Sequence, residues 1–282
     1  MGAPKIAAVL MLVSIMMHTG LQIDRAAIAN ALTHYRLLVR ALLANFVVVP
    51  LLGILLVRLF HLNEAIATGV LLMAISPGVP MLVRSAGAKQ GGSLGLAVTL
   101  AFLMPALSIV TVPLMAGFVL PQRASAAINT TNLAISLAFF QLLPLVLGML
   151  IKERAPAIAA KLMRPLPFAA IAALLALLVL LWGRIVASVS IVYGSSGIIV
   201  VLLLVTLSLA LGWSLGGADR EYRRTLGIGT ALRNVGLSAL VATSTFRSVP
   251  EVFAAVVCYL LVQALASMLV GIYFKRTAAQ PA

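Results

Sequence analysis

Two interrupted apolar stretches decide the fold of this chain: SPGVPMLVRSAG at residues 76–87 and LGIGTALRNVG at residues 226–236. Each breaks an apolar run with proline or glycine and carries one arginine, Arg84 or Arg233. In lipid, backbone N–H and C=O groups must be satisfied internally, so a break at membrane depth survives only where protein buries it or where it lines a cavity. One such segment in each half of a chain points to a secondary transporter with its substrate site between the breaks.

The composition is typical of a membrane protein. Hydrophobic residues make up 63% of the 282 residues and charged residues 9%, whereas a typical soluble domain carries about 25% charged residues. The single cysteine excludes a disulfide framework and a thiolate metal site. A net charge of +14 would suggest nucleic-acid binding in a soluble protein, but here the basic residues fall mostly in predicted loops and no nucleic-acid motif accompanies them. The predicted class is an all-α polytopic membrane protein in a lipid bilayer.

Nine spans are predicted from windows of about 20 apolar residues. They cover residues 5–23, 37–60, 64–88, 92–120, 128–151, 166–187, 195–216, 222–246 and 250–274, and the third and eighth are broken. With nine spans, thirteen Lys and Arg residues fall in loops on one side and five on the other. Because cytoplasmic loops carry the excess of positive charge, the N-terminus is predicted outside and the C-terminus in the cytoplasm.

Arg84 and Arg233 are the two cations that fall inside broken spans. A central arginine costs roughly 2.5–3.5 kcal/mol on insertion scales, so something must compensate. All six acidic residues lie at predicted span ends or in loops, which leaves half-helix carbonyls, water or an anionic ligand as partners. Two alternatives stay open: the arginines tie down loose carbonyls, or Arg84 snorkels to the cytoplasmic face.

Two further polar residues are candidates for the site. Asn45, just before Pro50, is predicted to touch it, because an amide in an apolar helix needs a partner. His18, in the first span, is a candidate for proton coupling or substrate binding because imidazole titrates near neutral pH, and a packed structural histidine is the alternative. The chain has no His-Glu-x-x-His or Gly-x-Ser-x-Gly motif and no aspartate pair at membrane depth, so we do not expect an enzyme.

The order of segments resembles the bile acid:sodium symporter family over nearly the whole chain. Within that family it resembles a bacterial member. The segments that carry the resemblance are HTGLQI (18–23), ANFVVVPLLG (44–53), EAIATGVLLMAISPG (64–78), SLGLAVT (93–99), LPLVLGMLI (143–151) and TLGIGTALRNVGLSALVATSTF (225–246). The resemblance implies a secondary transporter of the bacterial inner membrane. It also implies alternating access for organic anions, either bile-acid-like molecules or small carboxylates.

The same resemblance implies a domain organisation. Family members have inverted repeats and two crossing broken helices, with a core domain and a panel domain that moves against it. By this analogy residues 37–120 and 195–274 form the core, and residues 5–23 and 128–187 form the panel of a single transmembrane unit.

The departures from the family pattern concern sodium. The family's Ser-Asn pair falls on Met81-Leu82 or Leu82-Val83, and a serine, a glutamate and a glutamine become Gly95, Gly229 and Arg233. Thr99, Asn234 and, conservatively, Asn45 keep the pattern. Hard cations need several oxygen ligands, so we expect sodium-independent transport, no bound metal and no other cofactor, with the charge of Arg233 in place of sodium. An atypical sodium site and a non-transporting sensor of the same fold are the alternatives.

The predicted site follows from these points. Its substrate-binding residues are Arg233, Asn234, Arg84, Asn45, Thr99 and His18, and its crossover backbone comprises Pro77, Gly78, Pro80, Gly229, Thr230 and Gly236. The expected partner is a small organic anion. A fold does not specify a substrate, so the sequence leaves open the identity of the anion, the direction of transport and the oligomeric state.

Overall fold

The computed structural model describes residues 2–23, 34–78, 91–194 and 196–278, and within these ranges the chain is helical with no β-strand. The helices of the first half are α1 (Ala3–Gln22), α3 (Tyr35–Leu43), η1 (Ala44–Val48), α4 (Val49–Leu59), α5 (Glu64–Ile75), α7 (Leu94–Val119) and α8 (Gln122–Ala126). Those that follow are α9 (Thr130–Leu137), η3 (Ala138–Leu142), α10 (Leu143–Arg154), α11 (Pro156–Met163), α12 (Pro165–Leu180), α13 (Trp182–Gly194), α14 (Gly197–Leu215), α15 (Arg220–Ala231), α16 (Val235–Thr245) and α17 (Pro250–Ala278). The elements η1 and η3 are single π-helical turns that join their α-helical neighbours into continuous helices.

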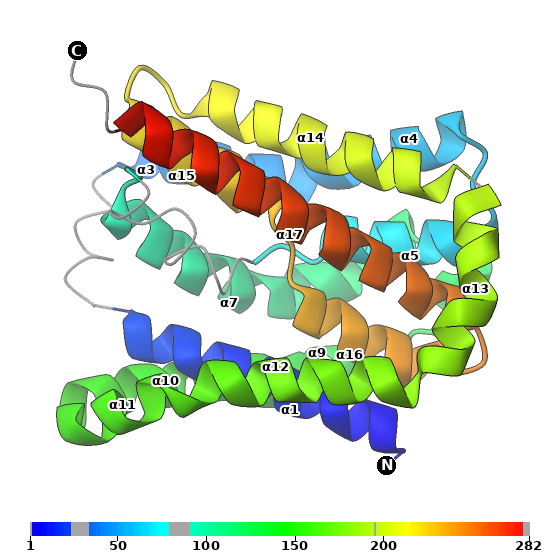
Figure 1. Ribbon diagram of the computed structural model, residues 1–282, viewed down its shortest axis with the longest axis horizontal. Coiled ribbons are helices and arrows are strands. Elements are labelled where there is room, and N and C mark those ends of the chain that lie inside the picture. Colours follow the sequence, from blue (N-terminus) through cyan, green and yellow to red (C-terminus); the bar gives the residue numbers. More distant parts are fainter. Residues whose placement is uncertain (1, 24–33, 79–90, 195, 279–282) are drawn as a thin grey trace.

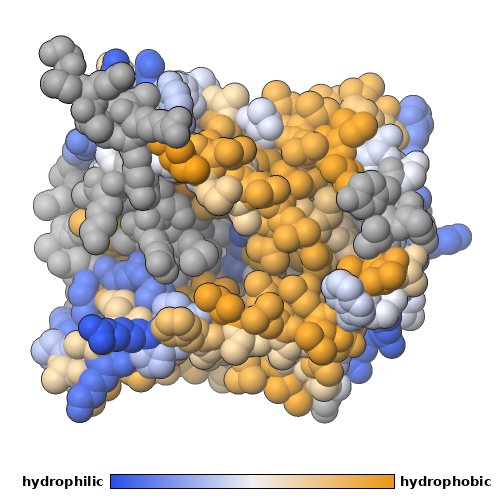
Figure 2. All heavy atoms as spheres, viewed as in Figure 1, coloured by the Kyte–Doolittle hydropathy of each residue, from blue (hydrophilic) through white to orange (hydrophobic). Residues whose placement is uncertain are grey.

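Seven helical runs in the described part of the chain are long and apolar enough to cross a membrane. They cover residues 3–22, 35–59, 94–119, 130–154, 156–180, 197–215 and 250–274. The two shorter apolar helices, α5 and α16, belong to the interrupted segments. Figure 2 shows hydrophobic residues over the middle of one face of the molecule and hydrophilic residues toward its two ends. The predicted all-α polytopic membrane fold is therefore confirmed, whereas the count of nine spans stays a prediction.

The helices form two groups that run roughly parallel to the long axis (Figure 1). α1, α10, α11 and α12 lie along one side, and α4, α14, α15 and α17 lie along the other. α1 packs against both α10 and α12, α14 packs against α15, and α5 packs against α17. α13 runs across one end and joins the first group to α14 (Figure 1). The division of the chain into a core (residues 37–120 and 195–274) and a panel (residues 5–23 and 128–187) stays a prediction.

One predicted span differs clearly in its bounds. The sequence pattern placed it at residues 166–187, but the membrane-length run covers residues 156–180 and the chain then turns into the separate helix α13. Pro156 and Pro165 both lie in the first turn of a helix. At that position the missing N–H of proline has no helical partner to lose, so proline starts a helix and does not end it.

A close helix contact fixes α1 against α10. A Cβ atom added to Gly20 would lie 3.0 Å from Gly148 Cα and would overlap the carbonyl oxygen of Leu145. At the end of α1, Lys152 Nζ donates to the carbonyl oxygens of Gln22 (3.2 Å) and Ile23 (2.9 Å). These bonds satisfy carbonyls that a helix C-terminus leaves without a partner.

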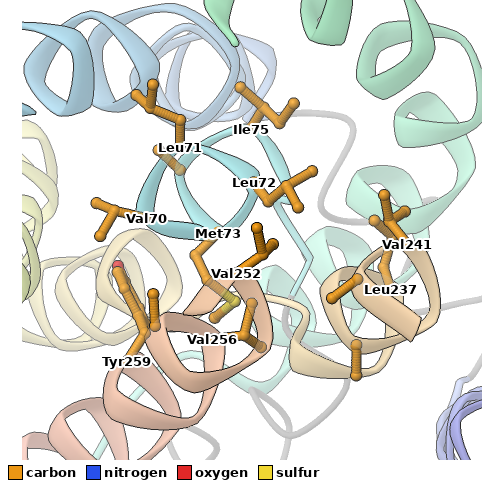
Figure 3. Close-up of a cluster of buried hydrophobic side chains, with 14 of the residues drawn as sticks. Val70, Leu71, Leu72, Met73, Ile75, Leu237, Val241, Val252, Val256 and Tyr259 are labelled. Carbon is orange, nitrogen blue, oxygen red and sulfur yellow. The ribbon is translucent and has the colours of Figure 1, made fainter. Parts of the chain in front are cut away.

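The interrupted segments are held by an apolar cluster. Figure 3 shows side chains from three helices gathered around it: Val70, Leu71, Leu72, Met73 and Ile75 of α5, Leu237 and Val241 of α16, and Val252, Val256 and Tyr259 of α17. α5 and α16 are each only about half the length that a bilayer requires. Their burial against α17 therefore supplies the packing that an isolated short helix would lack.

Candidate functional site

The two interrupted segments meet in the middle of the molecule. Residues 76–78 follow α5, and residues 232–234 join α15 to α16. Pro77 and Arg233 form an isolated antiparallel bridge, and the backbone N–H of Asn234 donates to the carbonyl oxygen of Ser76 at 3.0 Å. Each break therefore supplies hydrogen-bond partners to the other, which is what non-helical backbone at membrane depth requires.

Side chains reinforce this crossing. Asn234 Oδ1 accepts from the N–H of Leu237 at 3.1 Å and so caps the start of α16. Ser238 Oγ donates to Ser76 Oγ at 3.0 Å, which ties α16 to the end of α5. Gly78 has a φ of +127°, a value that residues other than glycine rarely adopt. A Cβ at Gly78 would lie 3.5 Å from Pro105 Cγ, so the break also passes close to α7.

Arg233 lies at the crossing and is only 3% exposed. Its Nη2 donates to the carbonyl oxygen of Thr230 at 3.0 Å, and its Nη1 donates to the carbonyl oxygen of Asn45 at 3.4 Å. Its backbone N–H donates to Gln263 Oε1 of α17 at 2.9 Å. The guanidinium thus stands where η1, α15 and α17 come together.

The surroundings of Arg233 are polar but not acidic. The hydrogen-bond acceptors of its side chain in the described residues are backbone carbonyls, and the hydroxyl of Tyr259 lies beside the guanidinium. Three buried atoms here have no hydrogen-bond partner among the described residues: Arg233 Nε, Tyr259 Oη and Asn45 Oδ1. Arg233 and Tyr259 interact electrostatically with each other. Buried polar atoms of proteins almost always have partners, so a ligand or water that entered this enclosed site would find donors and acceptors there.

Two buried amides enter the site from π-helical turns. Asn45 lies in η1 and Gln141 lies in η3, and both side chains are fully buried. Pro50 and Pro144 occupy the first turn of the α-helix that follows each π turn. Proline removes one helical hydrogen bond and crowds the carbonyl four residues before it, and a widened turn relieves this conflict. The prolines therefore explain why the helices open at the positions where the two amides point inward.

Gln141 connects the crossing to two other long helices, its own span at residues 130–154 and α7. Asn234 Nδ2 donates to Gln141 Oε1 at 2.8 Å. Gln141 Nε2 in turn donates to the carbonyl oxygen of Pro105 at 2.8 Å and to Ser108 Oγ at 2.7 Å. One side chain thus links the span at residues 130–154 to the crossing and to α7.

The structure brings some of the predicted site residues together. Arg233, Asn234 and Asn45 meet at the crossing with Pro77 and Gly78, and Asn45 Nδ2 also donates to Thr230 Oγ1 at 3.5 Å. Gly229 and Thr230 lie in the last turn of α15 and Gly236 lies in the first turn of α16, so the break falls between them.

Other predicted residues have local partners or cannot be placed. Thr99 is buried in α7 and donates to the carbonyl oxygen of Gly95 in the same helix at 2.9 Å. His18 forms a hydrogen bond with Gln22, one turn further along α1. Arg84 and Pro80 lie outside the described residues. Whether any of these residues binds substrate stays a prediction.

Sequence reasoning missed three polar residues of the site: Gln141, Gln263 and Tyr259. Each has apolar neighbours on both sides in the sequence, and Gln263 and Tyr259 share the last predicted span. The argument applied to Asn45, that an amide in an apolar helix needs a partner, holds equally for Gln141 and Gln263 and would have found both.

The comparisons with known proteins identify a family for most of the chain. The model of the Sodium Bile acid symporter family matches residues 9–191, which is roughly two thirds of the chain. The match includes the first interrupted segment and ends before the second, so Arg233 and Asn234 lie outside it. None of the curated proteins matches this chain. Because the family match covers well over half of the residues, the chain belongs to the sodium bile acid symporter family.

Proposed function

We propose that this protein is a secondary transporter of organic anions that works by alternating access without sodium, and that Arg233 binds the anionic group of the substrate. The observation that carries the proposal is a buried guanidinium at the crossing of two interrupted helices whose side-chain acceptors, among the described residues, are neutral carbonyls. A buried cation without a carboxylate partner costs free energy unless a ligand supplies negative charge. An incoming carboxylate would supply it.

The geometry around Arg233 suits a carboxylate. A guanidinium presents its N–H donors as a planar fork, and carboxylates accept two of them at once. Arg233 Nε has no partner among the described residues, and the bond from Nη1 to Asn45 is long at 3.4 Å. A carboxylate would take Nε together with Nη2, the terminal nitrogen on the same side of the guanidinium, while the second hydrogen of Nη2 keeps the bond to Thr230. Asn234 at the start of α16 adds the positive end of a helix dipole next to Arg233 in the chain.

The donor set at the second break does not fit a sodium ion. Na⁺ would need several oxygen ligands free to face it. In this chain the carbonyl oxygens of Thr230 and Asn45 accept from Arg233, and the fixed positive charge of the guanidinium repels a second cation. Arginine also stays protonated throughout the physiological pH range, so its charge does not change during a transport cycle. Energy coupling then has to come from the gradient of the anion itself or from another ion.

The proposal also says which parts of the protein would move against each other. Residues 5–23 and 128–187 would move as the panel against a core that contains the crossing. Gln141 is the polar contact through which the span at residues 130–154 touches Asn234, and such contacts would break and form again in each cycle.

Following the charge bias of the loops, we place the N-terminus outside the cell and the C-terminus in the cytoplasm. Arg84, which follows the first break in the sequence, is the second cation that we propose to bind the substrate.

A ligand screen followed by a flux assay tests the function. Purified protein is screened by thermal shift against organic carboxylates, from small keto and hydroxy acids to bile-acid-like amphiphiles, with sodium and with potassium. A carboxylate that stabilises the protein in both salts is then supplied, isotopically labelled, to proteoliposomes. Uptake driven by the gradient of the anion supports the transporter. Stabilisation without any flux would show a sensor of the same fold, and the absence of any stabilising carboxylate would overturn the anion site.

A further inference from the structure

A second cationic site lies at the end of the molecule where α1 begins, far from Arg233. It is a pocket of about 360 Å³, within the usual size range of small-molecule sites. Lys5 of α1, Arg184 of α13 and Arg247 after α16 line it, and none of the described residues that line it is acidic. α16 separates this pocket from the crossing, and its 11 residues span about 16 Å at 1.5 Å per residue.

The backbone around the pocket adds positive potential. Pro4 near the start of α1, Arg184 in the first turn of α13 and Pro250 at the start of α17 all line it. The first turns of three helices therefore lie at one pocket, and each helix N-terminus carries about half a positive elementary charge. The carbonyls at the end of α16 would oppose this, but Arg247 Nε donates to the carbonyl oxygen of Thr243 at 3.1 Å and offsets them.

Two of the three cations around the pocket donate to backbone carbonyls. Arg184 Nη1 donates to the backbone carbonyl oxygen of Arg247 at 3.0 Å, which holds α13 against the end of α16. This bond uses one of the five N–H donors of Arg184. The side chains of Arg184 and Arg247 are exposed. Both can therefore turn their remaining donors toward a ligand.

The rest of the pocket is apolar. Leu181, Phe246 and Phe253 form part of its wall, together with the aliphatic side chain of Ile185. A purely inorganic anion would leave this wall without a contact, whereas an apolar chain that carries one anionic group would use both halves of the pocket. The lining thus matches an amphipathic anion.

We propose that this pocket is a second binding site, selective for amphipathic molecules with a carboxylate or phosphate group. The anionic group lies among Lys5, Arg184 and Arg247, and the apolar part packs on Phe246 and Phe253. The source of this chemistry is either a soluble alkyl carboxylate or the headgroup of an anionic lipid. The site does not depend on the role proposed for Arg233.

Equilibrium dialysis with labelled octanoate tests the site. The protein carries Arg233→Gln, so that binding at the crossing does not contribute, and it is held in phosphatidylcholine nanodiscs with empty nanodiscs as the blank. We expect saturable octanoate binding that weakens as salt screens the charges. Lys5→Gln and Arg247→Gln should each lower the affinity by about threefold or more, the scale of a partly exposed charge pair. Lys5→Arg should keep it.

The controls separate charge from general effects. Arg123→Gln removes an exposed cation of α8 that does not line the pocket, and it should leave octanoate affinity unchanged. Unchanged melting curves show that the variants are folded. Octanol, which has the same chain without the charge, should bind much more weakly. If phosphatidylglycerol in the nanodiscs displaces octanoate, the natural occupant is a lipid headgroup, and if it does not, the occupant is a soluble carboxylate.

Three results would overturn the proposal. They are the absence of saturable octanoate binding, equal affinity for octanol, and unchanged affinity in both Lys5→Gln and Arg247→Gln. Because every measurement is made with Arg233→Gln, a failure here leaves the proposed function untouched. Loss of carboxylate binding at the crossing alone would likewise leave this second site untouched.

Discussion

Replacing Gln141 by leucine should destabilise the protein because it removes three hydrogen bonds at once. Gln141 bonds Asn234, Pro105 and Ser108, and interhelical hydrogen bonds in membranes contribute about 0.6 kcal/mol each on average. Their sum is about 1.8 kcal/mol. Leucine also leaves Asn234 Nδ2 without the acceptor that the described residues provide, and a buried unsatisfied donor costs about 1–3 kcal/mol. Together these terms predict a loss of about 3–5 kcal/mol in the free energy of unfolding.

Unfolding in mixed micelles with increasing SDS measures this loss. Thr99→Val is the matched control, because Thr99 bonds only a carbonyl of its own helix among the described residues and should cost clearly less. A double-mutant cycle isolates the contact with Asn234. Asn234→Ser keeps a good helix cap but removes the amide donor. The coupling between Gln141→Leu and Asn234→Ser should be about 0.6–1.7 kcal/mol, and strictly additive effects would refute the bridge.

Three further predictions concern topology, sodium and helix packing. Reporters active only in the periplasm or only in the cytoplasm, fused to each end, should place the N-terminus outside and the C-terminus inside, and both ends on one side would contradict an odd number of spans. Binding of a carboxylate ligand, measured by calorimetry, should be the same in sodium and in potassium at constant ionic strength; a tenfold gain in sodium, about 1.4 kcal/mol, would reveal a sodium site. Gly20→Ala should lower stability by about 1–3 kcal/mol because its methyl group overlaps α10, whereas Gly117→Ala, with open space around it, should be neutral or slightly stabilising in the same unfolding assay.

The sequence allowed the interrupted helices to be predicted because their signals are local. Proline and glycine in an apolar run mark a break wherever the run packs, and an arginine there stands out against the surrounding residues. The structure places the second break at residues 232–234, inside the predicted segment 226–236. Arg233 and Asn45 were identified for a similar reason, as polar residues that an apolar span cannot leave without a partner, whereas Asn234 was identified because it keeps the family pattern.

The contacts between distant segments were not predictable in this way. Gln141 meets Asn234 across 93 positions of sequence, and only the packing of the helices decides which buried amide faces which. The π turns before Pro50 and Pro144 also cannot be predicted from the spacing of apolar residues. They depend on how the backbone relieves the steric conflict that a proline causes in mid-span. The shifted span at residues 156–180 has a related cause, since proline can either start or interrupt a helix.

The affinity of Arg233→Gln for the stabilising carboxylate, measured by calorimetry alongside its unfolding free energy, tests the central claim most directly. Arg220→Gln, which removes an exposed cation from the start of α15, is the matched control. If Arg233 binds the anion, Arg233→Gln should lose about 1.5–3 kcal/mol of binding free energy, roughly 10- to 150-fold in affinity. Its stability should hold or rise, since a buried unpaired charge is removed. Normal binding together with lost stability would show that Arg233 is a structural clamp for the carbonyls of Thr230 and Asn45, and would contradict the proposal.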